Sequence, residues 1–214
     1  MKKVLKVLGI IVIILVIFAV VIGVAVLNLL KDGGLQSNRQ ASEEEITEAV
    51  KQMGDGILDG GFYLDGKVYQ LPVTIADLSE GGWVFDDALK EQFPEFPAHA
   101  VTNNINIDNA NDTQKALSIV LCNLSEETKT LEEVNIAQIS MGEFTANKVI
   151  LPQGITLDST MDEVIAAYGE PAKLERRSEM CLIYENGTWK IALYFENKED
   201  GTGTMTSVNY RLIY

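Results

Sequence analysis

The segment Ser159-Thr-Met-Asp-Glu-Val-Ile-Ala-Ala-Tyr-Gly-Glu-Pro171 decides the expected fold, because it carries the signals of a short amphipathic helix. Ser159 and Asp162 have the spacing of a capping box, and apolar residues then recur with helical spacing. Gly169 is a typical left-handed stop, and Pro171 prevents the helix from continuing. We therefore expect a helix that buries one face.

Three apolar segments that follow this helix are typical of β-strands. They cover residues 180–185, 188–195 and 204–213, and the Asn186-Gly187 pair between the first two favours a tight hairpin. Residues 144–214 are therefore expected to form a helix packed on a three-stranded antiparallel meander.

The preceding part of the chain shows the same plan. Ser42 with Glu45, and Thr74 with Asp77, have the spacing of two further capping boxes. The expected strands cover an Asp65-Gly66 hairpin and residues 101–108, 116–124 and 134–141, with a bulge near Ala137 and a short turn of helix over residues 86–93.

A local repeat supports two units. The segment Asn-Lys-Val-Ile-Leu-Pro at residues 147–152 resembles Gly-Lys-Val-Tyr-Gln-Leu-Pro at residues 66–72. The expected fold class is α+β, with one N-terminal transmembrane helix followed by two tandem helix-plus-antiparallel-meander units, residues 43–143 and 144–214.

The second unit resembles the repeat of the superfamily of beta-lactamase-inhibitor-protein-like and small outer-membrane-assembly lipoprotein domains. The motif consists of Gly154-x-Thr156, Val164 and Gly169-x-Pro171, followed by a meander. The first unit departs from it, with Gly81-Gly82-Trp83 in place of Gly-x-Pro. The setting is similar to uncharacterised exterior proteins of Gram-positive Firmicutes with a single membrane anchor. This resemblance implies a non-enzymatic, protein-binding module of the cell envelope and carries over no catalytic residue.

Residues 7–30 form an uncharged run in which Asn28 is the single polar side chain. As a helix this run would be about 36 Å long, enough to cross a hydrocarbon core of about 30 Å. We therefore expect residues 1–31 to be a signal-anchor that contacts membrane lipid through residues 7–30, followed by a linker over residues 32–42.

The charges beside the run set its orientation. Lys2, Lys3 and Lys6 precede it, so the positive-inside rule places the N-terminus in the cytoplasm and residues 31–214 outside the cell membrane. The alternative is a secretory signal that is cleaved after the small residues Gly23-Val24-Ala25.

The part of the chain after residue 30 is strongly acidic. It holds all 31 acidic residues and 14 of the 17 basic ones, a net charge of −17. Such a charge disfavours nucleic acid and anionic lipid headgroups. Two cysteines, Cys122 and Cys181, permit one disulfide, but the sequence does not decide whether they pair.

Catalytic and metal-binding residues are scarce. His99 is the single histidine and is expected in an exposed loop, so no catalytic residue is predicted. Asp55, Asp59 and Asp65 lack the spacing of a calcium loop and are better explained as turn residues. We expect no enzyme, no cofactor and no metal site.

Aromatic residues remain as candidates for a binding surface. They are Trp83, Tyr184, Trp189, Tyr194 and Tyr210. Exposed Tyr and Trp residues dominate protein interfaces, whereas core packing is the alternative explanation. The sequence thus indicates a protein- or envelope-binding module outside the membrane, or else a structural tether or exterior subunit of a membrane complex.

Overall fold

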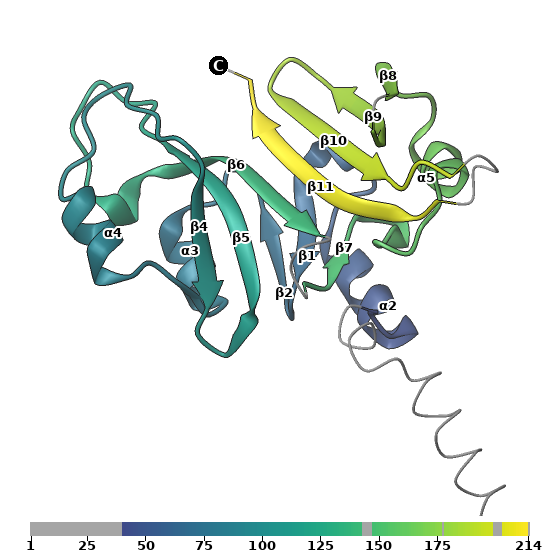
Figure 1. Cartoon of the computed structure of the whole chain (residues 1–214), viewed down its shortest axis with the longest axis horizontal. Helices are drawn as coiled ribbons and strands as arrows, with labels where there is room; N and C mark the ends of the chain where they lie inside the picture. Colours follow the sequence, from purple (N-terminus) through teal and green to yellow (C-terminus); the bar gives the residue numbers. More distant parts are fainter. Residues whose placement is uncertain (1–39, 143–146, 177, 199–202, 214) are drawn as a thin grey trace, which may run out of the picture. The chain divides into compact units, whose positions relative to one another are not determined.

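An eight-stranded antiparallel sheet is the main feature of the computed structural model, which describes residues 40–142, 147–176, 178–198 and 203–213 (Figure 1). Its strand order is β3-β4-β5-β6-β11-β10-β9-β8. The strands are β3 (Trp83–Val84), β4 (Ile105–Asn109), β5 (Asp112–Cys122), β6 (Asn135–Gly142), β8 (Lys173–Arg176), β9 (Met180–Glu185), β10 (Trp189–Phe195) and β11 (Met205–Leu212).

A second, three-stranded sheet has the order β2-β1-β7. It consists of β1 (Gly61–Leu64), β2 (Lys67–Gln70) and β7 (Val149–Ile150). Asp65 and Gly66 connect β1 to β2, both with positive φ (49° and 106°), and this confirms the predicted hairpin.

The carboxyl group of Asp65 is nearly inaccessible. It lies 2.8 Å from the ammonium group of Lys115 on β5 and accepts a hydrogen bond from the Lys148 backbone N–H at 2.9 Å. Burial raises the pKa of Asp65, although the Lys115 charge opposes this shift. The residue therefore fixes the hairpin against the large sheet, in agreement with the prediction that it serves a turn.

Short helices and turns connect the strands. The helices are α2 (Glu43–Gln52), α3 (Ile75–Glu80), α4 (Asp87–Gln92) and α5 (Met161–Tyr168), and the 3-10 turns are η1 (Ile57–Asp59), η2 (Leu131–Glu133) and η3 (Pro152–Gly154). The capping boxes predicted at Ser42 and Thr74 are confirmed. For α5 the cap is Thr160 with Glu163, one residue later than predicted, because Ser159 instead accepts a hydrogen bond from the Thr156 backbone.

One face of the large sheet forms the main hydrophobic core. Alternate residues of β4, β5, β6 and β9–β11 point into it, together with Val73, Leu78 and Val164 from the helical segments. Tyr210 of β11 stacks on Phe62 of β1 with ring centroids 5.4 Å apart, so the small sheet packs against the same core. A bulge in β6 at Ala137 is confirmed, since Val120 and Leu121 pair with Gln138 and Ile136.

An internal repeat is visible in the backbone pairing. The cap residue Thr74 forms a bridge with Asn135 at the start of β6, and Thr160 forms one with Thr204 just before β11. In both places the carbonyl group before the threonine accepts a hydrogen bond from the strand. The Ile136 N–H donates to Val73 at 2.8 Å, and the Met205 N–H donates to Ser159 at 3.0 Å. Each short helix is therefore fixed to the last strand of its meander in the same way.

The expected fold class is nevertheless wrong as stated. The strands do not form two separate sheets, because β11 pairs with β6 over five residue pairs and joins both meanders into one sheet. β7 from the second half completes the small sheet of the first half. Within the described part of the chain, no helix is long and apolar enough to cross a membrane. The predicted anchor, residues 7–30, lies outside the described residues.

Candidate functional site

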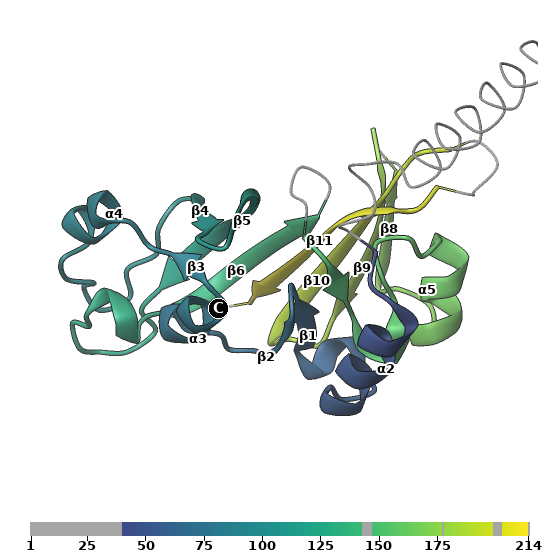
Figure 2. The same cartoon turned by 90° about the horizontal axis from the view of Figure 1, so that it is seen from below.

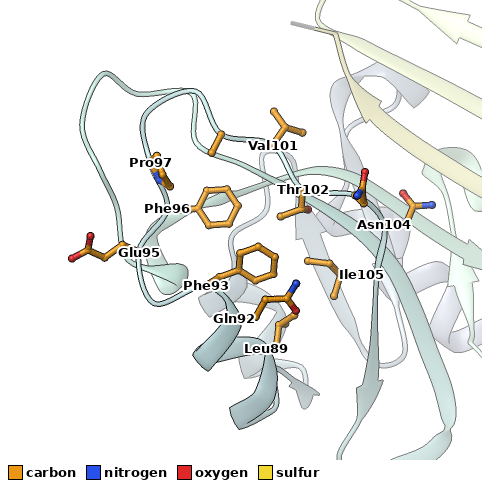
Figure 3. Close-up of a pocket in the computed structure, with 12 residues that line it drawn as sticks. Leu89, Gln92, Phe93, Glu95, Phe96, Pro97, Val101, Thr102, Asn104 and Ile105 are labelled. Atoms are coloured by element: carbon orange, nitrogen blue, oxygen red, sulfur yellow. The ribbon is translucent and has the colours of Figure 1, made fainter.

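A groove lies between helix α4 and the outer side of strand β4 (Figure 3). The Asp86 carboxylate caps α4 by accepting a hydrogen bond from the Leu89 N–H at 2.8 Å. The helix ends at Phe93, and Pro94 follows, so the chain leaves α4 as an extended loop. This confirms the short helix predicted over residues 86–93.

The buried side chain of Asn123 holds the loop that closes one end of the groove. Its amide group donates to the carbonyl oxygens of Phe96 (2.9 Å), Pro97 (3.0 Å) and Glu127 (2.7 Å). Phe96 also exchanges two backbone hydrogen bonds with Lys129, at 2.7 Å and 2.9 Å. The loop is thus fixed to the main sheet before any ligand binds.

The groove has an apolar floor and a polar rim. Its larger part has a volume of about 510 Å³, within the range of ligand-binding sites. Phe93 and Phe96 stand together on the floor with ring centroids 5.6 Å apart, and Leu89 faces Ile105 across it, as Figure 3 shows. Polar side chains of Gln92 and of residues 102–104 line the rim.

A second hollow of about 330 Å³ continues the groove along β4. Leu89 and Gln92 line both parts, and the second part ends beside Val84, Asn106 and Asp108. The groove therefore follows β4 from the loop at Val101 to the place where β3 begins to pair.

The strand edge that forms one wall of this groove has no neighbouring strand. β3 pairs with β4 at Asp108 and Asn109, and in the described part of the chain no strand lies outside Ile105–Ile107. On the other side β4 is fully paired with β5, from Ile105 with Ile119 onward. The edge therefore presents unpaired backbone donors and acceptors.

The charge around the groove is negative. Glu95, Asp86 and Asp108 contribute carboxylates, and among the described lining residues there is no lysine or arginine. The site therefore favours a cationic ligand with apolar parts.

The aromatic residues predicted as a binding surface lie mostly in the interior. Trp83, Tyr184, Trp189 and Tyr210 are buried in the main core, and Tyr194 is half-buried on the opposite face of the sheet. The Tyr184 hydroxyl donates to the Gly169 carbonyl oxygen at 2.9 Å, and burial raises the pKa of Tyr184 to about 12. These residues are not brought together as an exposed patch.

The other chemical candidates have local structural roles. His99 lies in an exposed loop, as predicted, with Nε2 3.1 Å from a Glu126 carboxylate oxygen. Cys122 and Cys181 are free thiols on β5 and β9, separated by three strands, or about 19 Å, which is too far for a disulfide. Within the described ranges no group of three potential metal ligands occurs.

Comparisons with known proteins identify no relative of this chain. No protein family matches the sequence, and neither a curated protein nor a solved structure is similar to it.

The groove was not predicted from the sequence, although one signal for it exists. Residues 101–107 contain no charge, which is unusual for a strand edge that faces solvent. The segment was predicted as a strand from residue 101, whereas regular pairing starts at Ile105.

Proposed function

We propose that this chain is a non-enzymatic protein-binding module of the cell envelope, attached to the membrane through residues 7–30 and displayed outside the cell. The groove between α4 and β4 is its binding site. The observation that carries the proposal is the preformed apolar floor of this groove beside a strand edge without a partner.

Three further features support a protein ligand. The floor holds the half-buried ring of Phe93, supported by the buried ring of Phe96, and aromatic side chains are frequent anchor sites for a partner's apolar side chain. The buried Asn123 makes the loop rigid, so little ordering is needed on binding. The acidic rim excludes polyanions and favours a partner with basic residues.

Site-specific photo-crosslinking in intact cells tests the proposal. A photoreactive amino acid at Val101, which lines the groove and is 44% exposed, should give a crosslinked adduct with a partner protein. Leu174 on β8 is 42% exposed, lies outside the groove and serves as the matched control. Equal crosslinking from both positions, or none from Val101, would contradict the assignment of the groove.

The membrane attachment has its own test. A protease added to intact cells should remove the acidic part of the chain, and deletion of residues 7–30 should release that part from the membrane fraction. Protection of the C-terminal part until lysis would contradict this placement.

A further inference from the structure

We infer that the groove binds its partner by strand addition: an extended segment, in which apolar residues alternate with lysine or arginine, pairs with the open edge of β4. This inference rests on the proposed protein-binding function and specifies the partner and the mode of contact.

The backbone of β4 has the geometry that strand addition requires. The N–H of Ala110 donates to the Gly82 carbonyl oxygen at 2.8 Å. In the antiparallel ladder, Val84 and Asp108 are therefore the next pair whose backbone N–H and C=O groups face each other. The backbone groups of Asp108 therefore face outward, and by the two-residue period of a strand those of Asn106 do so too.

The same orientation occurs at the other end of the groove. Val101 forms a bridge with Cys122, flanked by the hydrogen bonds Thr102 N–H to Leu121 and Asn123 N–H to Ala100, at 3.0 Å and 2.9 Å. In such a pair the central residue turns its own N–H and C=O away from the neighbouring strand. The backbone groups of Val101 and Asn106 thus face the groove, whereas those of Asp108 are already paired with Val84.

The chain itself leaves this position empty by turning away. β3 ends at Val84, and Asp86 then begins α4. If β3 continued past Val84 in the same register, residue 86 would lie opposite Asn106. The groove therefore lies in line with β3, and an added segment would extend β3 between β4 and α4.

Comparison of the two sheet edges supports a binding role for this one. β8, at the opposite edge, has the sequence Lys-Leu-Glu-Arg, and charged residues of this kind prevent pairing with another chain. At the other edge, the stretch Val-Thr-Asn-Asn-Ile-Asn-Ile at residues 101–107, which leads into β4 and has no outer strand, has no charge, and Asp108 of β4 lies where β3 pairs. Only one of the two edges is protected.

Side chains of an added strand would alternate between two environments. One set would contact Leu89, Phe93 and Ile105 on the floor, and the other set would face the rim with Glu95 and Asp108. The first environment selects apolar residues and the second selects lysine or arginine. A second copy of this chain is disfavoured, because the acidic part carries a charge of −17.

A displayed library of random decapeptides, selected on the full chain in detergent micelles, tests the inference. The enriched peptides should show apolar residues at alternate positions and an excess of lysine and arginine. N-methylation of the alternate residues whose N–H groups face β4 should weaken binding about tenfold or more, whereas methylation of the other set should change it less than about threefold.

Two pairs of variants locate the contact. Asn106→Pro removes an outward N–H that no strand uses and should abolish binding, whereas Asn106→Ala should retain it. Glu95→Lys should weaken binding of the lysine-rich peptides, and Glu91→Lys, with the same change of charge outside the groove, should have a smaller effect.

The outcomes separate this inference from the proposed function. Peptides that bind in the groove but tolerate both sets of N-methyl groups would overturn strand addition and leave protein binding intact. No enrichment, or binding unaffected by Asn106→Pro and Glu95→Lys, would overturn strand addition. Failure of the Val101 crosslink as well would overturn the proposed function.

Discussion

Removal of the Tyr210 hydroxyl should stabilise the protein. Tyr210 is completely buried, stacks on Phe62, and its hydroxyl oxygen has no hydrogen-bond partner within the described structure. Burial also raises the pKa of Tyr210, so the hydroxyl remains neutral. Tyr184 is the matched control, because its hydroxyl is bonded to the Gly169 carbonyl.

The magnitude follows from the cost of an unpaired group. A buried polar group without a partner costs about 1–3 kcal/mol, whereas a made hydrogen bond contributes about 0.5–1.5 kcal/mol. Tyr210→Phe should therefore raise the free energy of unfolding by about 1 kcal/mol, and Tyr184→Phe should lower it by about 1 kcal/mol. For a domain of this size, each change corresponds to a shift in Tm of about 2–4 °C.

Urea unfolding of the full chain in detergent, followed by tryptophan fluorescence, measures both changes. Trp83 and Trp189 are buried in the same core and report its exposure. A loss of stability of 1 kcal/mol or more in Tyr210→Phe would refute the reasoning, since it would show that the hydroxyl has a partner. Both variants should retain the Val101 crosslink, because neither residue lines the groove.

Three further outcomes are expected. Thr74→Ala and Thr160→Ala should each lower the free energy of unfolding by about 1 kcal/mol through loss of a helix cap, as measured by urea unfolding. Burial raises the pKa of Asp65 in the folded protein above its unfolded value of about 3.9, so the parent protein loses stability as the pH rises from about 3.9 through the raised pKa. Asp65→Asn does not ionise, and its stability relative to the parent should therefore increase over this range. Unfolding curves measured between about pH 3.5 and 7 test this. Because Cys122 and Cys181 do not pair, addition of reductant should not change the gel mobility of the protein. Because both are buried, they should react with a thiol reagent only in denaturant.

The local elements could be predicted from the sequence because their causes are local. The Asp65-Gly66 hairpin follows from two residues that accept positive φ, and the Ser42 cap follows from one side chain at a fixed spacing. The bulge at Ala137 was visible as a change in the alternation of apolar residues. These features do not depend on which strands become neighbours.

The sheet topology and the site could not be predicted in this way. Pairing of β6 with β11 joins residues about 70 positions apart, and no local pattern specifies it. Because strand neighbours were unknown, the sequence also left open whether Tyr184 and Trp189 are exposed or packed in the core, and both prove to be in the core. The groove requires α4 to stand beside an edge that only the complete sheet defines.

The way in which the two meanders join explains why a binding edge exists. Since the last strands, β6 and β11, meet at the centre, the first strands of both meanders are placed at the outside of the sheet. Each outer edge must then be protected or used. β8 carries charged residues, whereas residues 101–107, along the open edge beside α4, carry none, and α4 is held there by its cap and a fixed loop. The uncharged edge and the acidic rim are therefore two parts of one site, and a partner that used only one of them would leave the other unexplained.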